Sequence, residues 1–396
     1  MDAFDHSQAV PSASILRHQS SLEGIMDFSR EPPLASELRA QAKRKFYLIV
    51  EHFEEFHKSD GQPYNQPQLI RYTYEYARSE ESQDNFLRAF FQALALSMDG
   101  GEDLNFDDLS SPFIGFAEHL FNNFFLPLRA SGTKTPQPTP AYHSAIMAAQ
   151  GGVPPGLVGT PDRLSSLRGD CLVRDRHRCV ISRMFDLKEV KIRLKENHNV
   201  AHDDDGNALV TSTDSFAWLE VAHIIPHALM KVEKACKVDD TKAATLAILN
   251  MFDCGVVHLI KGPNIDRPSN AISLTLHLHR VFGEFDLFFE PILDQPHTYR
   301  IQSFLEKGFL GEATLPITRT LYLSENRTID PPSPRLLALH SAIAHILHLS
   351  GAGEYIGQLL RDMDDMDGVS IREDGSTELG QFVRLRLGRS GHSVRT

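Results

Sequence analysis

Two separated segments constrain the fold of this chain more than any other feature. Residues 221–225 are mostly apolar and β-branched and are stopped by a proline, which predicts a short strand with His223 near its end. Residues 270–276 alternate apolar and polar side chains, which predicts a second strand, and the residues after it, with His277 and His279, predict a helix. Such a strand, loop, strand and helix can bring imidazoles to opposite sides of one phosphate-sized gap, an arrangement that suits metal-assisted phosphodiester hydrolysis.

Four ordered motifs extend this pattern. They are Arg174-Asp175-x-x-x-Cys179-x-x-Ser182, Ala222-His223-Ile224-x-Pro226, Asn270-x-x-x-Leu274 and His279-x-x-Phe282-Gly283. Together they resemble the HNH endonuclease family, whose active site is a ββα-metal finger, and specifically its fungal branch. The resemblance implies an α+β fold, with an HNH-like ββα-metal unit flanked by helical N-terminal and C-terminal regions.

The resemblance also implies a role for each matched residue. His223 takes the place of the general base, for which an imidazole is suited by its ordinary pKa near 6.5. Asn270 fixes the loop, either by orienting the base or by giving a carbonyl oxygen to the metal, and His279 is a metal ligand. We therefore expect His223, Asn270 and His279 to be catalytic, and His279, Asn270 and His277 to bind one divalent ion, Mg²⁺, Mn²⁺ or Zn²⁺.

Two positions depart from the family pattern. Many relatives carry a metal ligand directly before the general base, where this chain has Ala222, and another four residues after the helical histidine, where it has Gly283. Nearby donors that can compensate are His277, His227, Glu284 and Asp286. Two hypotheses follow: a metal-dependent DNA endonuclease in which His223 activates water, which we favour, and a catalytically degenerate HNH-derived module that binds nucleic acid or regulates.

The charge distribution bears on the partner. The net charge of −12 argues against binding a polyanion, but residues 163–196 hold ten Lys or Arg against five Asp or Glu. Arg174, Arg176 and Arg178 are the expected phosphate contacts, with a solvated surface as the alternative interpretation. DNA is the expected partner and RNA the alternative. Residues 203–205, three consecutive aspartates, favour a solvated turn over a metal site.

The cysteines argue against a zinc-knuckle protein, and the hydropathy argues against a secreted or membrane protein. The four cysteines form no CxxC pair, so a structural zinc knuckle is not predicted. No apolar run resembles a signal peptide or reaches eighteen residues. We therefore expect an intracellular protein, nuclear or cytoplasmic, with no membrane partner, and leave its oligomeric state open.

Composition and periodicity divide the chain into six segments. A Phe-rich stripe at helical spacing marks the second segment, where core packing explains the aromatic residues better than base stacking does. The predicted segments are a disordered leader (1–30), a helical N-terminal domain (31–131), a Pro/Gly-rich linker (132–160), the HNH nuclease-like domain (161–300), a helical C-terminal extension (301–369) and a flexible tail (370–396).

Overall fold

The computed structural model describes most of the chain between residues 32 and 366. The described ranges are 32–57, 62–101, 103–132, 160–198, 200–210, 215–227, 240–306, 308–311, 313–324 and 327–366. The predicted leader (1–30), nearly all of the predicted linker (133–159) and the predicted tail (370–396) lie outside these residues.

The N-terminal part is a layer of helices, as its periodicity predicts. Its elements are α1 (Ser36–His57), α2 (Gln66–Glu75), α3 (Glu80–Ala93), α4 (Phe106–Leu120), a π-helical turn (Phe121–Phe125) and α5 (Leu126–Gly132). Three of the helices begin at a polar cap. The side chains of Asn65, Ser79 and Asn105 accept hydrogen bonds from backbone N–H groups in the first turns of α2, α3 and α4.

Aromatic rings fill the centre of this layer. Phe46, Phe86, Phe90 and Phe116 are each 1% exposed or less, and their rings meet mostly edge to face. Rings in this geometry gain about 0.5–1.5 kcal/mol per pair beyond the area that they bury. The prediction that the phenylalanine stripe is core is confirmed.

The central part holds the predicted ββα unit. Strand β3 (Leu219–His223) pairs antiparallel with β4 (Ala271–Thr275), and α11 (Leu276–Gly283) follows β4 directly. His223 is the last residue of β3 and lies opposite Ala271. The strand begins and ends two residues earlier than the sequence predicts, because residues 224 and 225 turn away after His223.

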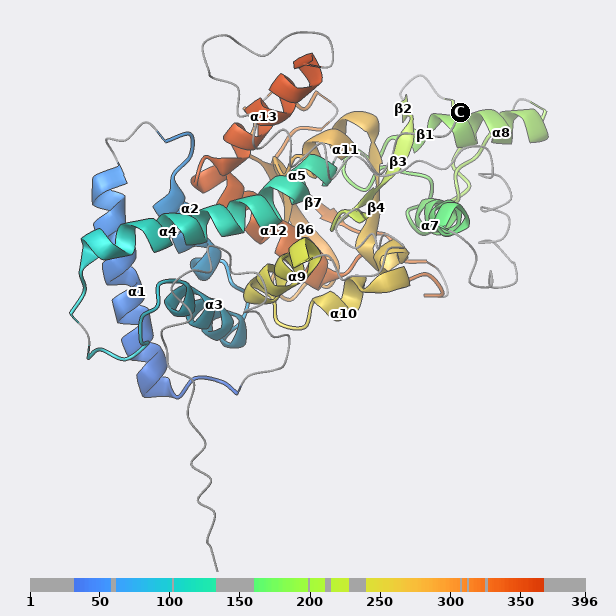
Figure 1. The fold of residues 1–396 in the computed structure, drawn as a ribbon. Coiled ribbons are helices and arrows are strands. Elements are labelled where there is room, and N and C mark those ends of the chain that lie inside the picture. The colour runs from blue at the N-terminus through green and yellow to red at the C-terminus, as the bar shows by residue number, and fades with distance from the viewer. Residues whose placement is uncertain are drawn as a thin grey trace, which may run out of the picture.

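Shorter elements surround this unit (Figure 1). Helix α7 (Thr160–Arg174) packs on the β3–β4 pair, and α8 (Leu187–Glu196) lies beyond it beside a small parallel pair, β1 (Phe185–Asp186) and β2 (Phe216–Ala217). Between β3 and β4 the structure describes α9 (Asp240–Phe252), then α10 (Val257–Ile260) and two 3₁₀ turns, Gly262–Asp266 and Pro268–Asn270.

The C-terminal part corrects one prediction. The segment from residue 301 is expected to be a helical extension, but it contains the end of β6 (Thr298–Ser303) and β7 (Ile317–Thr320), which belong to an antiparallel sheet that begins with β5 (Leu287–Pro291). Burial alternates along β7 and from Tyr299 to Gln302 of β6, which is strand periodicity. The predicted helices follow only after residue 333, as α12 (Pro334–Leu349) and α13 (Ala352–Met366).

One buried cluster connects these parts. Apolar side chains from α1 to α13 form a continuous core, in which the ring of Phe124 stacks on that of Phe252 with centroids 5.0 Å apart. Helices α5 and α11 approach closely, since a Cβ added to Gly132 would lie 2.0 Å from the carbonyl oxygen of Gly283. The helical layer therefore supports the helix that carries His279.

The described helices were compared with the length and hydropathy of a membrane span. No single one of them is long and apolar enough to cross a bilayer, whereas α12 and α13 taken together pass on length and composition, with a bend of 83° between them.

Candidate active site

His223 lies buried at the end of β3 with one nitrogen bonded and one without a partner. Its Nε2 lies 3.2 Å from Oδ1 of Asp266, which belongs to the 3₁₀ turn before β4. Its Nδ1 is also buried and has no hydrogen-bond partner among the described residues. A buried polar atom of this kind costs free energy unless a water, an ion or a substrate group meets it.

Asp266 organises the polar groups around His223. Its Oδ1 is also 2.7 Å from Nδ1 of His227, and its Oδ2 lies 3.4 Å from Nε of Arg163 on α7. Burial alone would raise the pKa of Asp266, but the hydrogen bonds from His223 and His227 outweigh it and lower the pKa well below its ordinary value. Asp266 is therefore ionised at neutral pH.

The charge on Asp266 fixes the tautomer of His223. A carboxylate only accepts hydrogen bonds, so the proton of the neutral imidazole lies on Nε2 and the lone pair on Nδ1. Burial lowers the pKa of His223 below its ordinary value against the opposing effect of Asp266, and the charges of His227 and His279 act in the same direction as burial. At neutral pH, His223 is thus a neutral imidazole whose unpartnered nitrogen can accept a proton.

Asn270 connects the two loops that hold this pair. Its side-chain oxygen accepts from the backbone N–H of Ile225, and its Nδ2 donates to the carbonyl oxygens of Ile225 and Ile265, all at 3.0 Å. Its own carbonyl oxygen accepts from the N–H of Ile224 at 2.8 Å. The amide therefore ties the turn after His223 to the turn that carries Asp266. This geometry fits the first of the two roles expected for Asn270, which are to orient the base or to give a carbonyl oxygen to the metal.

His279 forms a second imidazole–carboxylate pair. Its Nδ1 lies 2.6 Å from Oε2 of Glu220 on β3. Because side chains alternate along a strand, Glu220 and Ala222 share one face of β3, toward His279 of α11, while Val221 packs with residues of α7 on the other face. His223, at the end of β3, is close enough to His279 for the charge of His279 to lower its pKa. Glu220 thus offers a carboxylate on the same face as Ala222, two residues earlier.

One cluster of donors and one further histidine offer ligand atoms for a divalent cation among the described residues. In the cluster, ligand atoms of His223, His227 and Asp266 all lie within 4.8 Å of one another. At the further histidine, Glu220 directs the Nδ1–H of His279 toward itself, so the lone pair of His279 lies on Nε2, as in metal sites where a carboxylate orients a histidine ligand. Imidazole with carboxylate suits Zn²⁺ and Mn²⁺, so the donor chemistry fits the predicted ion without selecting one.

The structure does not bring His277 to the other expected ligands. His277 is exposed and its Nε2 lies 3.1 Å from the carbonyl oxygen of Phe309. Two residues along a helix correspond to a rotation of about 200°, so His277 and His279 project from opposite sides of α11. The expectation that His277 binds the metal is therefore corrected.

Arg174 is also corrected as a phosphate contact. Its side chain is fully buried, pairs with Asp175, and donates hydrogen bonds to the carbonyl oxygens of Pro268 and Ala271 at 2.7 and 2.9 Å. Asp175 in turn accepts from the N–H of Ser273 on β4 at 3.1 Å. A guanidinium in this position holds the start of β4 in place and cannot reach a polyanion.

Each of the three consecutive aspartates, residues 203–205, forms an ion pair with an arginine of this region. Arg176 pairs with Asp205 at 2.5 Å and Arg178 with Asp203 at 2.9 Å, while Asp204 pairs with Arg193 at 2.6 Å. Arg176 and Arg178 keep partly exposed side chains, so their expected role in phosphate contact stays a prediction. It would require each arginine to exchange a carboxylate for a phosphate.

Sequence reasoning missed Asp266 and Glu220. Asp266 lies in a turn without periodicity, and its only signal is its position four residues before Asn270. Glu220 lies two residues before Ala222, and strand alternation places it on the same face. His227, one of the nearby donors that the sequence offers, lies beside the site with its Nδ1 on Asp266.

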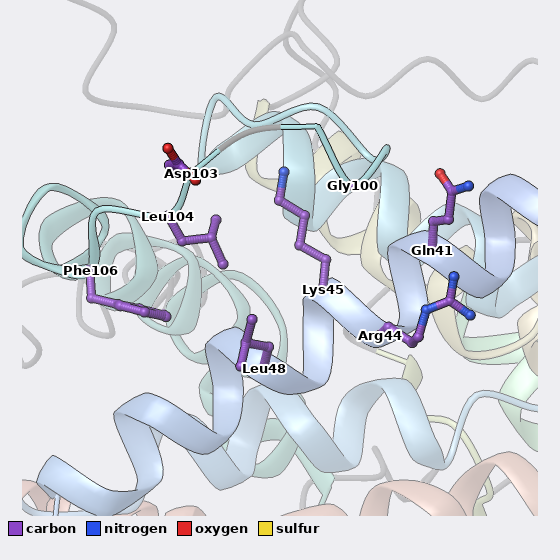
Figure 2. Close-up of a pocket in the computed structure, with 8 residues that line it drawn as sticks. All are labelled: Gln41, Arg44, Lys45, Leu48, Gly100, Asp103, Leu104 and Phe106. Carbon is purple, nitrogen blue, oxygen red and sulfur yellow. The ribbon is translucent and has the colours of Figure 1, made fainter.

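A surface pocket lies elsewhere, on the N-terminal helices. It has a volume of about 420 Å³ between α1 and the segment before α4, and Figure 2 shows the ammonium group of Lys45 directed toward that segment. Its lining residues are Gln41, Arg44, Lys45, Leu48, Gly100, Asp103, Leu104 and Phe106. None of the expected site residues is among them, so this pocket is separate from the candidate active site.

A ββα unit with an imidazole on its first strand and another on its helix defines the class of HNH-type nucleases. Residues 179–290 match the family described as HNH endonuclease. The match includes His223, Asp266, Asn270 and His279, and it implies a nuclease-type function with a nucleic-acid substrate. No curated protein and no solved structure gives a significant match. The assignment to the fungal branch stays a prediction.

Proposed function

We propose that the protein is a metal-dependent endonuclease that hydrolyses phosphodiester bonds in DNA, with His223 as the general base. The observation that carries this proposal is the pair formed by His223 and Asp266. A buried carboxylate holds the imidazole in one tautomer and leaves the unpartnered Nδ1 as the proton acceptor. General bases of this kind contribute about 10²–10⁴-fold to rate.

The reaction step follows from that geometry. Nδ1 of His223 takes a proton from a water molecule as the water oxygen bonds to phosphorus and the bond from phosphorus to the 3′ oxygen breaks. The imidazolium that forms is stabilised by the charge of Asp266, 3.2 Å from Nε2. Asn270 keeps the two loops in register, so that base and carboxylate stay aligned.

His279 would hold the divalent ion through Nε2, and Glu220 would orient the imidazole of His279 through its Nδ1. The ion, when bound, supplies positive charge to the phosphate and to the leaving oxygen. Asn270 stays in the proposed site as the residue that fixes the loop. The cluster of His223, His227 and Asp266 is the competing location, and it would turn His223 from a base into a ligand.

Nicking of supercoiled plasmid with Mg²⁺ or Mn²⁺ tests the proposal. His223→Ala should lower the nicking rate by about 10²–10⁴-fold while the thermal unfolding curve stays unchanged. His258→Ala, which removes an exposed histidine, is the matched control and should keep the wild-type rate. Cleavage that is independent of His223, or no cleavage of single-stranded and duplex DNA with either metal, would contradict the proposal.

The competing function is a degenerate HNH module that binds nucleic acid without cleaving it. One observation favours it: Gly283 lies where relatives carry a ligand, and its backbone serves the close contact with Gly132. Calorimetry with Mn²⁺ distinguishes the two. The enzyme proposal predicts a specific site that His279→Ala destroys and His277→Ala leaves intact, whereas the module predicts no such site.

A further inference from the structure

An exposed tryptophan precedes the strand that carries His223. Trp218, the single tryptophan of the sequence, is 49% exposed and directly adjoins β3. Tryptophan is among the residue types that are enriched at contact surfaces relative to the rest of a protein surface. Its role is not explained by the core, because it does not belong to the buried clusters of the described residues.

One cation lies over the ring of Trp218, and another binds the backbone of the next residue. Nζ of Lys191 lies 5.1 Å from the centroid of the ring, within cation–π range. Arg168 of α7 donates a hydrogen bond of 2.7 Å to the carbonyl oxygen of Leu219, the residue after Trp218. The pKa of Lys188 is lowered by burial and by the charge of Arg168, which indicates that these cations are crowded together.

The lysines of α8 lie on one face. Lys188, Lys191 and Lys195 are spaced three and four residues apart, which places them along one side of the helix. Glu189, the acidic residue between them, is buried and pairs with Arg193 at 2.9 Å, whereas Lys191 and Lys195 are exposed. The nearby Arg176 and Arg178 each pair with an aspartate.

We propose that Trp218 and the lysine face of α8 bind a single-stranded segment of polynucleotide, with an unpaired base stacked on the indole and phosphates on the lysines. The proposal rests on the proposed function, since it gives that site its substrate form. Base stacking on an aromatic ring requires an unpaired base, whereas a paired base shows the protein only its edge. The indole is what favours a nucleic acid over an acidic protein segment, for which lysines alone would serve.

The location fits a substrate that continues into the active site. Five residue steps along β3 separate Trp218 from His223, a distance of about 17 Å at roughly 3.3 Å per residue. Stacked nucleotides are about 3.4 Å apart, so this distance corresponds to about five nucleotides, or fewer where the single strand is extended. A strand held at Trp218 is therefore anchored a few nucleotides from the phosphate at His223.

Tryptophan fluorescence tests the proposal directly, because all tryptophan emission comes from Trp218. The probe is a 12-nucleotide oligo-dT, added to the full chain carrying His223→Ala in the presence of EDTA, so that no cleavage is needed. We expect saturable quenching with oligo-dT and little with the dA·dT duplex of the same length. Absence of quenching by oligo-dT, or equal quenching by the duplex, would overturn the proposal.

Variants define which side chains carry the binding, measured by anisotropy of fluorescein-labelled oligo-dT. Trp218→Ala should weaken binding about 5- to 100-fold and Trp218→Phe much less. Lys191→Gln should weaken it severalfold and reduce the slope of log K against log salt by about 0.7. The matched controls are Phe309→Ala, which removes a ring that is 66% exposed, and Lys261→Gln, and both should bind as the parent does.

Three further outcomes separate this proposal from others. If polyglutamate quenches Trp218 as oligo-dT does, the surface recognises acidic polymers in general and the proposal is wrong. If plasmid nicking fails but oligo-dT still binds through Trp218, the binding surface stands and the proposed nuclease function falls. If His223-dependent nicking occurs and Trp218→Ala changes neither binding nor KM, only the binding surface falls.

Discussion

The helical layer of α1 to α5 and the β3–β4–α11 unit both bury large side chains, but the buried chemistry differs. In the helical layer the largest buried groups are aromatic rings that meet one another. In and around the ββα unit they include Arg174, Asp175, Asn270 and His223, and most of their polar atoms have a specific partner.

The difference teaches where stability and function separate. Apolar rings gain free energy from burial alone, so their exact neighbours matter less. Buried polar groups cost free energy unless they are paired, and a pair therefore fixes one geometry. Burying polar groups in the ββα unit therefore costs free energy of folding but fixes the orientation of the site. The apolar core of the helical layer offsets that cost.

The largest expected effect is on the helical side of the comparison. Phe90 is fully buried and its ring contacts Phe46, Phe86 and Phe116. Phe90→Ala should lower the free energy of unfolding by about 3–5 kcal/mol, measured by denaturant titration. Leu48→Ala, at a position that is 55% exposed, should change it by less than about 0.5 kcal/mol. A loss below about 1 kcal/mol for Phe90→Ala would break the comparison.

A smaller effect is expected on the polar side, at Glu220. Glu220→Gln removes the charge that orients His279 and should lower Mn²⁺ affinity about 10- to 100-fold, measured by calorimetry, with little loss of stability. Glu284→Gln on the same helix end is the matched control, because that carboxylate pairs with exposed Arg280.

The competing location for the ion gives the opposite result. If Mn²⁺ affinity is unchanged in Glu220→Gln but is lost in His227→Ala, the ion lies on the cluster of His223, His227 and Asp266. Such a result would refute the assignment of His279 as the ligand and would leave the fold unaffected.

The smallest expected effect lies at the boundary of the two regions, at His340 of α12. This buried histidine donates a hydrogen bond to the carbonyl oxygen of Phe282, and burial lowers its pKa to about 3. The unfolded chain binds a proton near pH 6.5 that the folded chain does not, so stability is full above that pH and falls as pH decreases from about 6.5 toward 3.

Comparison with a variant isolates this contribution. Between pH 6 and pH 4, His340→Gln should show a stability slope that is shallower by up to about 1.4 kcal/mol per pH unit, measured by denaturant titration at each pH. His258→Gln, at an exposed position, should keep the wild-type slope. Equal slopes for wild type and His340→Gln would show that burial does not hold His340 neutral.

The same contrast explains how much could be predicted from the sequence. The helices around Phe46 and Phe90 follow from helical spacing, and β3, β4 and α11 follow from the motifs, because both signals are local. The partner of His223 could not be predicted, since Asp266 is 43 residues away and reaches it only through the turns that Asn270 ties together. The pairing of Arg178 with Asp203 could not be predicted either, because it joins separate segments of the chain. A count of charges along the sequence does not show which cations are paired.

The central claim is that His223 acts as a base rather than as a metal ligand. Chemical rescue tests it most directly: His223→Gly leaves a space for an added imidazole, and plasmid nicking is followed with a series of substituted imidazoles in saturating Mn²⁺. The account predicts that nicking returns and that its rate rises with the pKa of the added imidazole, while His279→Gly is not rescued in this way. No rescue, or a rescued rate that depends on the Mn²⁺ concentration and not on the imidazole pKa, would contradict the claim.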